Sequence, residues 1–284
     1  STNDTNLSWI DDGGGIGYLN FGSNDTETNS ISVGPNKFYR GFDAIQLGAG
    51  DDTWLASTND LNVANVRGDS GNDKLSFEDY ELDYEVFSKD IIESNYFLFE
   101  EINLTSGSNT WLYSANDNVF SIIDAIGGED DLLIQENLTW TLQDINRYKN
   151  FETLRLQNSY LEFDSYDLGD IRSLILESNT ILDLDDGSLN NLINYSQNSD
   201  SVLRVNVQTN LSSSARIEAI HIEFNPDSSV QFFGDTGSFA VGNRYTNYLG
   251  QASSSIDVNE INLFENNPGS IDVKNWFIDS DGLY

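Results

Sequence analysis

Glycine and aspartate recur in three short stretches of the chain at a spacing that suits a cation-binding turn. The stretches read Gly48-Ala-Gly-Asp-Asp-Thr-Trp54, Gly68-Asp-Ser-Gly-Asn-Asp-Lys-Leu75 and Gly127-Gly-Glu-Asp-Asp-Leu-Leu133. Glycine lets the backbone bend so that carbonyl oxygens point inward, and a carboxylate can close the site around calcium, which takes about six to eight oxygen ligands. We therefore predict calcium ligands among these residues: Gly48, Gly50, Asp51, Asp52, Gly68, Asp69, Gly71, Asp73, Gly128, Asp130 and Asp131.

The three stretches fall at one position of an internal repeat, which must hold them in space. Each copy reads apolar-x-x-apolar-x-apolar, then a small turn residue, then a second apolar-x-apolar stretch. The copies begin at Phe42, Val63, Phe99, Phe120, Phe151, Ile171, Ile217 and Val258. Clear neighbours are about 20 residues apart, a period typical of solenoids, in which a unit buries its apolar face only by stacking on the next. The apolar-x-apolar steps have the period of a strand, so we predict two short strands per copy.

The repeat predicts an all-β chain that folds as a parallel β-solenoid over residues 42–273, with coils of about 20 residues and turns of Gly, Asn and Asp. The copy that begins at Ile171 also fits the leucine-rich-repeat template, but glycine turns and strand-like second halves favour the β-solenoid. Longer gaps between copies are either loops or degenerate coils, and the stretch from Val202 to Val207 fits one such coil; the gaps are 78–98, 135–150 and 185–216.

The two ends of the chain depart from the repeat. Residues 1–41 are predicted to form an N-terminal cap or a segment that reaches another subunit. Their apolar pair Trp9-Ile10 and the glycine joint Gly13-Gly14-Gly15 would let a strand add to a neighbouring sheet. Residues 274–284 are predicted to form a C-terminal cap or tail.

The Gly-x-Asp turns resemble the nonapeptide of the RTX, or haemolysin-type, calcium-binding family, whose pattern is Gly-Gly-x-Gly-x-Asp-x-apolar-x. The resemblance implies calcium ions shared by stacked turns, and the longer repeat also looks like those of bacterial surface-layer and large secreted RTX proteins. Leu47 stands where the family has its first glycine, and Asp69 where it has its second. Most later copies lack the aspartate, so we expect calcium sites between residues 48 and 131; the residues at that position there are Leu161, Ile181, Asp227 and Pro268.

Composition narrows the function. Asp and Glu number 47 against 13 Lys and Arg, a formal charge of −34. Such charge strains a compact fold unless counter-ions sit among the carboxylates, and it disfavours nucleic acid as a partner. No cysteine occurs, and no apolar run reaches the length of a membrane span, which favours an extracellular or cell-surface protein without membrane insertion. A bacterial source is what the RTX resemblance implies.

Residues for catalysis are few. His221 is the only histidine and takes an outward position on a predicted strand, which disfavours Ser-His-Asp or Cys-His chemistry. Arg155 and Arg172 lie in neighbouring coils, and β-helical polysaccharide lyases resemble such an arrangement and use calcium with a basic residue. A calcium-dependent polysaccharide lyase or epimerase is therefore one alternative, and a glycan-binding adhesion module is another.

The preferred hypothesis is a non-enzymatic structural protein. An open-ended stack, acidic turns and a large negative charge together indicate a calcium-binding subunit that assembles into a surface layer, filament or matrix. Its predicted partners are copies of itself and cell-surface polysaccharide, and its predicted cofactor is Ca²⁺.

Overall fold

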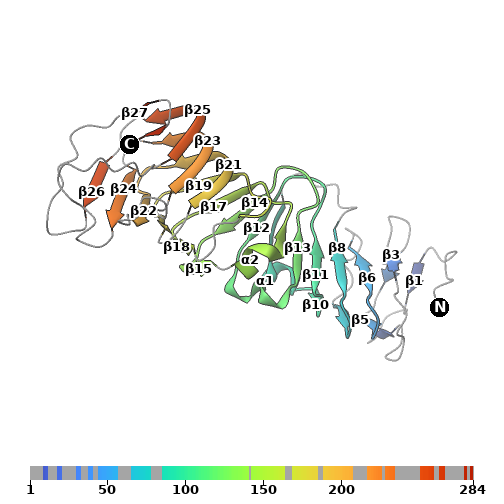
Figure 1. Cartoon of the computed structure of the whole chain (residues 1–284). Coiled ribbons are helices and arrows are strands. Elements are labelled where there is room, and N and C mark those ends of the chain that lie inside the picture. The colour runs from blue at the N-terminus through green and yellow to red at the C-terminus, as the bar shows by residue number, and fades with distance from the viewer. Residues whose placement is uncertain are drawn as a thin grey trace. The chain divides into compact units, whose positions relative to one another are not determined.

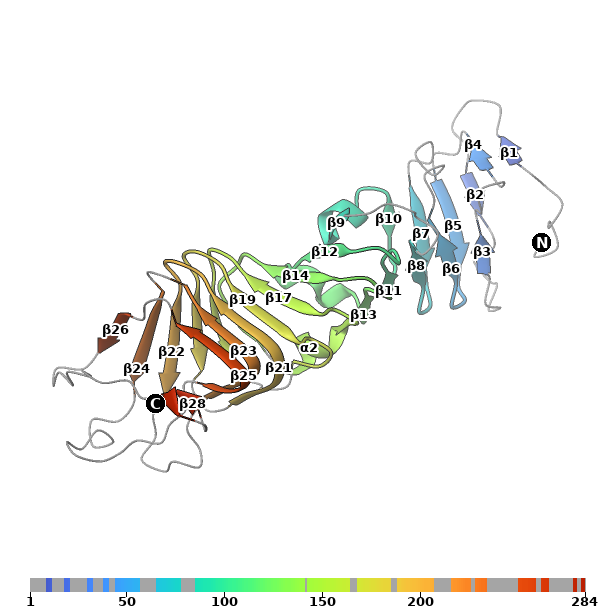
Figure 2. The same cartoon turned by 90° about the horizontal axis from the view of Figure 1, so that it is seen from above.

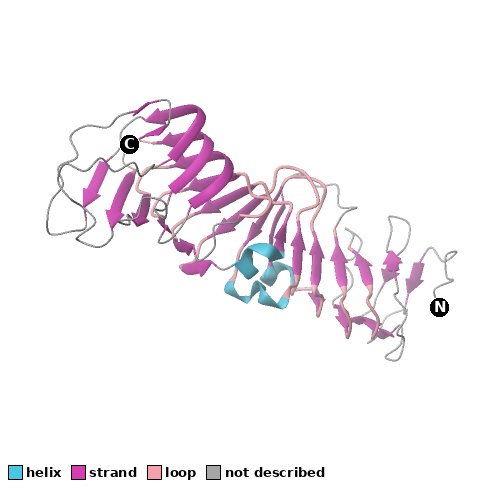
Figure 3. Cartoon of the chain, in the orientation of Figure 1, coloured by secondary structure: helices cyan, strands magenta, loops and turns pink. Residues whose placement is uncertain are grey.

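The computed structural model describes residues 9–11, 18–20, 30–32, 38–40, 44–56, 65–77, 85–140, 142–163, 168–184, 188–206, 216–225, 228–233, 250–258, 262–265, 278–279 and 282–283. In these residues strands predominate, and helix is confined to short segments (Figure 3). The helical segments are α1 Lys89–Ile92, the 3-10 helix η2 Ala115–Val119 and α2 Leu142–Arg147. The chain forms two compact units: unit 1 is Ser1–Asp131 with Arg147–Phe151, and unit 2 is Leu132–Asn146 with Glu152–Tyr284.

Unit 1 is a stack of short parallel strands (Figure 1). Its strands are β1 Trp9–Asp11, β2 Tyr18–Asn20, β3 Ser30–Ser32, β4 Phe38–Arg40, β5 Ala44–Gly48, β6 Thr53–Leu55, β7 Val66–Asp69, β8 Lys74–Ser76, β9 Glu85–Ser88, β10 Tyr96–Phe97, β11 Glu101–Asn103, β12 Asn109–Leu112, β13 Ile122–Asp124 and β16 Tyr148–Lys149. They pair in the orders β2-β5-β7-β10 and β3-β6-β8-β11-β13-β16, with β1 on β4 and β9 on β12.

Unit 2 repeats the arrangement with longer strands. Its strands are β14 Asp131–Ile134, β15 Leu138–Trp140, β17 Thr153–Leu156, β18 Tyr160–Phe163, β19 Ser173–Leu176, β20 Ile181–Leu184, β21 Ser188–Gln197, β22 Val202–Asn206, β23 Arg216–Phe224, β24 Ser229–Phe233, β25 Gly250–Val258, β26 Asn262–Glu265, β27 Ile278–Asp279 and β28 Gly282–Leu283. Figure 2 shows β19, β21, β23 and β25 side by side, and β17 precedes them in the same parallel order. A second parallel sheet has the order β15-β18-β20-β22-β24-β26.

The core lies between these sheets because every second residue of a strand points inward. Leu154 pairs with Leu174, which pairs with Tyr195, and all three are buried. Leu161 and Leu182 form the matching pair on the other sheet. Burying such a side chain contributes about 1.5–3 kcal/mol, so the repeated apolar columns hold one coil on the next.

The prediction of a parallel β-solenoid is confirmed. Residues 21 apart meet on neighbouring coils, as Asp52 and Asp73 do. The second half of the copy that begins at Ile171 is strand β20, paired with β18 and β22, so the leucine-rich-repeat alternative is not what the chain forms. All three gaps hold strands that pair in parallel with the stack. β9 and β10 fall in the first gap, β15 and β16 in the second, and β21 and β22 in the last, as expected for the stretch after Val202.

The described parts of the two ends are also strands. In residues 1–41, β2 and β3 pair in parallel with β5 and β6, so the segment continues the stack within its own chain. Its pairing with another subunit stays a prediction. In residues 274–284, β27 and β28 form an antiparallel pair, and Leu283 of β28 lies opposite Gly250 of β25. The rest of this tail lies outside the described residues.

Candidate metal-binding turns

A column of buried polar side chains follows the corner of unit 1 where the predicted turns lie. Asp52, Asp73 and Asp130 each immediately precede the second strand of a coil, and Asn109 begins one; all are 2% exposed or less. Asp73 Oδ1 accepts a hydrogen bond from the backbone N of Asp52 at 2.8 Å. Asp130 Oδ1 accepts one from the backbone N of Asn109 at 2.7 Å. Each carboxylate therefore ties its turn to the turn of the preceding coil.

Close packing between stacked turns explains why these turns contain glycine. Gly71 has φ +151°, and a Cβ there would lie 2.0 Å from the carbonyl oxygen of Gly50. Gly128 has φ +127°, and a Cβ there would lie 2.5 Å from the carbonyl oxygen of Gly107. Stacked turns thus approach backbone to backbone, which excludes any side chain whether or not a cation binds.

The second turn contains a carboxylate oxygen that lacks a donor. Asp73 is fully buried, and among the described residues its Oδ2 has no hydrogen-bond partner. A Cβ on Gly68 would come within 2.6 Å of this oxygen and 2.3 Å of the carbonyl oxygen of Leu98. Both oxygens therefore border the space beside the Gly68 Cα. Glu100 joins the group, since its Oε2 accepts a hydrogen bond from the backbone N of Asp73 at 2.8 Å.

The environment of Asp73 disfavours its charged form. Burial raises the pKa of Asp73 from 3.8 to about 6, and the hydrogen bond from the Asp52 backbone opposes this rise. The negative charges of Asp52, Glu100 and Asp51 raise the pKa further. Because the folded pKa lies above the ordinary one, Asp73 stabilises the fold at low pH and loses that contribution as pH rises through about 6. A bound cation would reverse this loss.

The remaining predicted ligands lie in different surroundings. Asp51 is exposed and accepts a hydrogen bond from the backbone N of Asn72 at 2.9 Å. Asp69 has φ +76° and lies 3.8 Å from Arg67 in an ion pair. Asp131 is partly buried in β14. The structure therefore brings Asp51, Asp52 and Asp73 to one corner, and it directs Asp69 to a cation of the protein itself.

The fit of these turns to calcium is partial. Among the described residues, no group of three or more His, Cys, Asp or Glu side chains is arranged to hold a metal ion. The buried Asp73 Oδ2 and the nearby Leu98 carbonyl suit a hard cation, but the other carboxylates accept backbone hydrogen bonds instead of converging on one point. Glu100 was not among the predicted ligands, although it directly follows the first apolar residue of the copy at Phe99.

The corner of unit 2 carries a neutral version of the same column. Its buried residues are 3% exposed or less and are Ser159, Thr180, Ser201 and Ser228. The first three follow a left-handed residue directly, so these turns are one residue shorter than Gly-x-Asp; the left-handed residues are Asn158, Asn179 and Asp200. Thr180 Oγ1 donates to the carbonyl oxygen of Leu156 at 3.0 Å. Leu161, which was aligned with the missing aspartate, is a core residue instead, and Asp227 lies outside the described residues.

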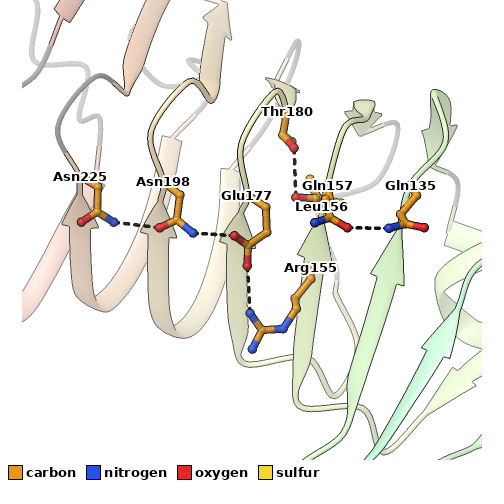
Figure 4. A network of polar contacts seen from close by, with 8 residues as sticks. All are labelled: Gln135, Arg155, Leu156, Gln157, Glu177, Thr180, Asn198 and Asn225. Atoms are coloured by element: carbon orange, nitrogen blue, oxygen red, sulfur yellow. Dashed lines mark hydrogen bonds and ion pairs between the residues drawn. The ribbon is translucent and has the colours of Figure 1, made fainter. Parts of the chain in front are cut away.

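A polar ladder runs beside this neutral corner (Figure 4). Asn225 Nδ2 donates to Asn198 Oδ1 at 2.9 Å, and Asn198 Nδ2 donates to Glu177 Oε2 at 2.8 Å. Glu177 also forms an ion pair with Arg155 at 3.1 Å. This ladder therefore uses amide side chains and one carboxylate whose charge an arginine compensates.

The candidate catalytic residues all belong to unit 2 and are not part of the predicted metal-binding turns. His221 is exposed on β23, as predicted. Arg155 pairs with Glu177, and Arg172 donates to the carbonyl oxygen of Gly169 at 2.7 Å. These contacts account for both arginines as surface partners of nearby acceptors, which gives the lyase alternative no support.

Comparison with known proteins identifies no relative: no protein-family model, curated protein or solved structure matches the chain. None of the described helices is long and apolar enough to cross a membrane. A function for the chain therefore has to be inferred from its own residues.

Proposed function

We propose that the chain is a non-enzymatic, extracellular structural protein that binds Ca²⁺ in the turns of unit 1 and assembles with copies of itself into a bacterial surface layer, filament or matrix. The observation that carries the proposal is Asp73, a fully buried carboxylate whose Oδ2 has no hydrogen-bond partner among the described residues. Buried polar groups are nearly always satisfied, so an unsatisfied carboxylate oxygen in a buried turn is a candidate ligand for a cation.

Electrostatics support a cation at this corner. The charges of Asp51, Asp52 and Glu100 all disfavour ionisation of Asp73. The nearest lysine in sequence, Lys74, pairs instead with Glu101 at 3.3 Å. Calcium would supply positive charge and an electron-pair acceptor to Asp73, with Asp52, Glu100 and the Leu98 carbonyl as further ligands. The first and third turns offer Asp52 and Asp130 at the equivalent position.

A structural role is supported by what the buried polar side chains do. They bond one coil to the next, as Asp73 to Asp52 and Asn109 to Asp130, and are directed at the stack instead of at an open surface. A net charge of −34 would hold copies apart, and calcium between acidic surfaces would remove that repulsion. Calcium would in the same way bridge the acidic chain to an anionic polysaccharide, which it would otherwise repel, and this fits a polysaccharide partner at a cell surface.

Thermal unfolding with and without calcium tests the metal. An ion that binds only the folded state stabilises it by about 2.7 kcal/mol at a hundredfold excess over Kd. Calcium should therefore raise the melting temperature, and Asp73→Asn should remove most of that rise. Asp183→Asn is the control in unit 2 because Asp183 is also buried, at 4% exposed, but its Oδ2 pairs with Arg204 and accepts a hydrogen bond from Tyr160. An unchanged melting temperature after chelation would refute calcium binding.

Light scattering tests the assembly separately. Particle size should grow with calcium in the millimolar range for the parent chain and for Asp183→Asn. A parent chain that binds calcium but stays monomeric would overturn the self-assembly part of the proposal and leave the metal part standing.

A further inference from the structure

A second buried carboxylate of unit 1, away from the turns, joins three segments. Asp117 lies in η2 and is 1% exposed. Its Oδ2 accepts hydrogen bonds from Trp111 Nε1 at 2.8 Å, from Tyr148 OH at 2.8 Å and from the backbone N of Ser114 at 3.1 Å. Trp111 belongs to β12 and Tyr148 to β16, so one oxygen ties a 3-10 helix to two strands.

Aromatic rings exclude water from this oxygen. The rings of Trp111 and Phe120 lie edge to face with their centroids 5.9 Å apart. The centroid of the Tyr148 ring lies 6.2 Å from that of Tyr113 and 6.1 Å from that of Phe151. Burial raises the pKa of Asp117, whereas its three hydrogen-bond donors and the charge of Arg147 lower it. Hydrogen bonds to a carboxylate are strongest in such a dry setting, so the removal of one donor should have a large local effect.

The segment held by this bond has little other support from its backbone. Residues 147–151 return to unit 1 after a stretch that belongs to unit 2. β16 is two residues long and pairs with β13, with Tyr148 opposite Ile123. One further backbone bond joins Ala125 N to Lys149 O at 3.0 Å. So short a strand forms few ladder bonds, which leaves side chains to fix it.

Two other side chains assist at its ends. Arg147 Nε donates to the carbonyl oxygen of Phe120 at 2.7 Å, and Asn150 Nδ2 donates to Asp124 Oδ1 at 2.7 Å. Both of these contacts are less buried than the bond between Tyr148 and Asp117. The phenol–carboxylate bond is therefore the most buried of these three polar contacts.

We propose that Asp117 is a latch that keeps β16 on the edge of β13 and thereby keeps that strand edge covered. When the Tyr148–Asp117 bond opens, residues 147–151 detach locally and β13 exposes unpaired backbone groups. An uncovered strand edge is a template for pairing with another chain, so the latch controls whether this side of unit 1 can add a strand. The proposal is independent of calcium binding.

Residue-resolved amide hydrogen exchange of the full chain tests the latch. Tyr148→Phe removes one donor and keeps the ring, and Asp117→Asn keeps the shape and removes the charge. Both should speed exchange of the Ala125 amide by about tenfold or more, because a buried hydrogen bond to a charged group is lost. The Lys74 amide, which bonds to the Asp52 carbonyl oxygen at 2.8 Å, should keep its rate.

Tyr160→Phe is the matched control, since its hydroxyl donates to Asp183 Oδ2 at 2.8 Å in unit 2 and should leave Ala125 unchanged when removed. An Ala125 rate that stays the same in both unit 1 variants overturns the proposal. So does an equal acceleration of Ala125 and Lys74, because Asp117 would then support the whole unit and not the segment 147–151.

Discussion

The corners of units 1 and 2 each contain a buried polar residue at the equivalent place in the coil, but the type of side chain differs. Unit 1 uses acidic or amide side chains, and unit 2 uses hydroxyls; the residues are Asp52, Asp73, Asn109 and Asp130 in unit 1, and Ser159, Thr180, Ser201 and Ser228 in unit 2. The fold therefore accepts a small polar side chain at the corner without needing a charge, and among the described residues Ser159 Oγ and Ser228 Oγ have no hydrogen-bond partner. Where unit 1 has a carboxylate at this position, burial of its negative charge is costly unless a proton or a cation neutralises it.

Backbone geometry explains how both versions fit one fold. In unit 1 glycine precedes the polar residue by two positions, and Gly71 and Gly128 take positive φ values against the turn before. In unit 2 an Asn or Asp in the left-handed conformation precedes it by one position, as Asn179 precedes Thr180. The glycine turn brings neighbouring backbones closer, so the two corners should differ in what they tolerate.

The largest expected difference concerns glycine itself. Gly71→Ala forces a Cβ to within 2.0 Å of the Gly50 carbonyl oxygen and should destabilise unit 1 by about 3 kcal/mol or more, measured by urea unfolding. Gly169→Ala in unit 2 also places alanine at positive φ, +61°, but nothing lies within 4 Å of its Cβ. It should cost only about 1–2 kcal/mol, and equal losses for the two variants would contradict the close stacking of the glycine turns.

The second largest expected difference between the two corners is their response to acid. With calcium chelated, lowering the pH from 8 to 5 should raise the melting temperature of unit 1, because the pKa of folded Asp73 is about 6 and its ordinary value is 3.8. Acid also relieves the general negative charge, so the informative quantity is the part of the rise that Asp73→Asn removes. If that variant responds to pH as the parent does, Asp73 is not the carboxylate that titrates.

The hydroxyl corner should show the smallest effect. Thr180→Val removes the bond to the Leu156 carbonyl oxygen and should cost about 1–2 kcal/mol by thermal unfolding, whereas Thr180→Ser should retain most of it. Neither variant should change the response to calcium. A calcium response altered by Thr180→Val would show that the two corners do not act separately.

Much of the fold followed from the sequence because strand periodicity and turn residues recur in one phase. Apolar pairs such as Leu182 and Leu184 point to the core, and glycine, asparagine or aspartate with positive φ marks the corners, as Gly71, Asn179 and Asp200 do. The helical segments α1 and α2 were not predicted, since they fall in gaps where the repeat pattern lapses. Local hydrogen bonds determine whether such a segment becomes helical, and the pattern of apolar residues gives no information about those bonds.

Less of the candidate site followed from the sequence. The spacing correctly gathered Asp51, Asp52 and Asp73 at one corner. It could not say which carboxylate oxygens the backbone would occupy, so neither the role of Glu100 nor the unsatisfied Asp73 Oδ2 was foreseen. The serine and threonine column of unit 2 was missed because its turns are one residue shorter, which moved the aligned position onto Leu161.

Several neighbouring coils share one spacing, which has a consequence for the history of the chain. In both units some corner bonds join residues 21 apart, as Asp52 to Asp73 and Asn158 to Asn179, whereas other coils are longer, as where Lys74 pairs with Glu101. Closing each such coil therefore carries the same loop entropy wherever it lies in the stack. Duplication or deletion of one such coil would change the length of the protein and leave the loop entropy of the other coils unchanged. We therefore expect the chain to lengthen or shorten in evolution by single coils.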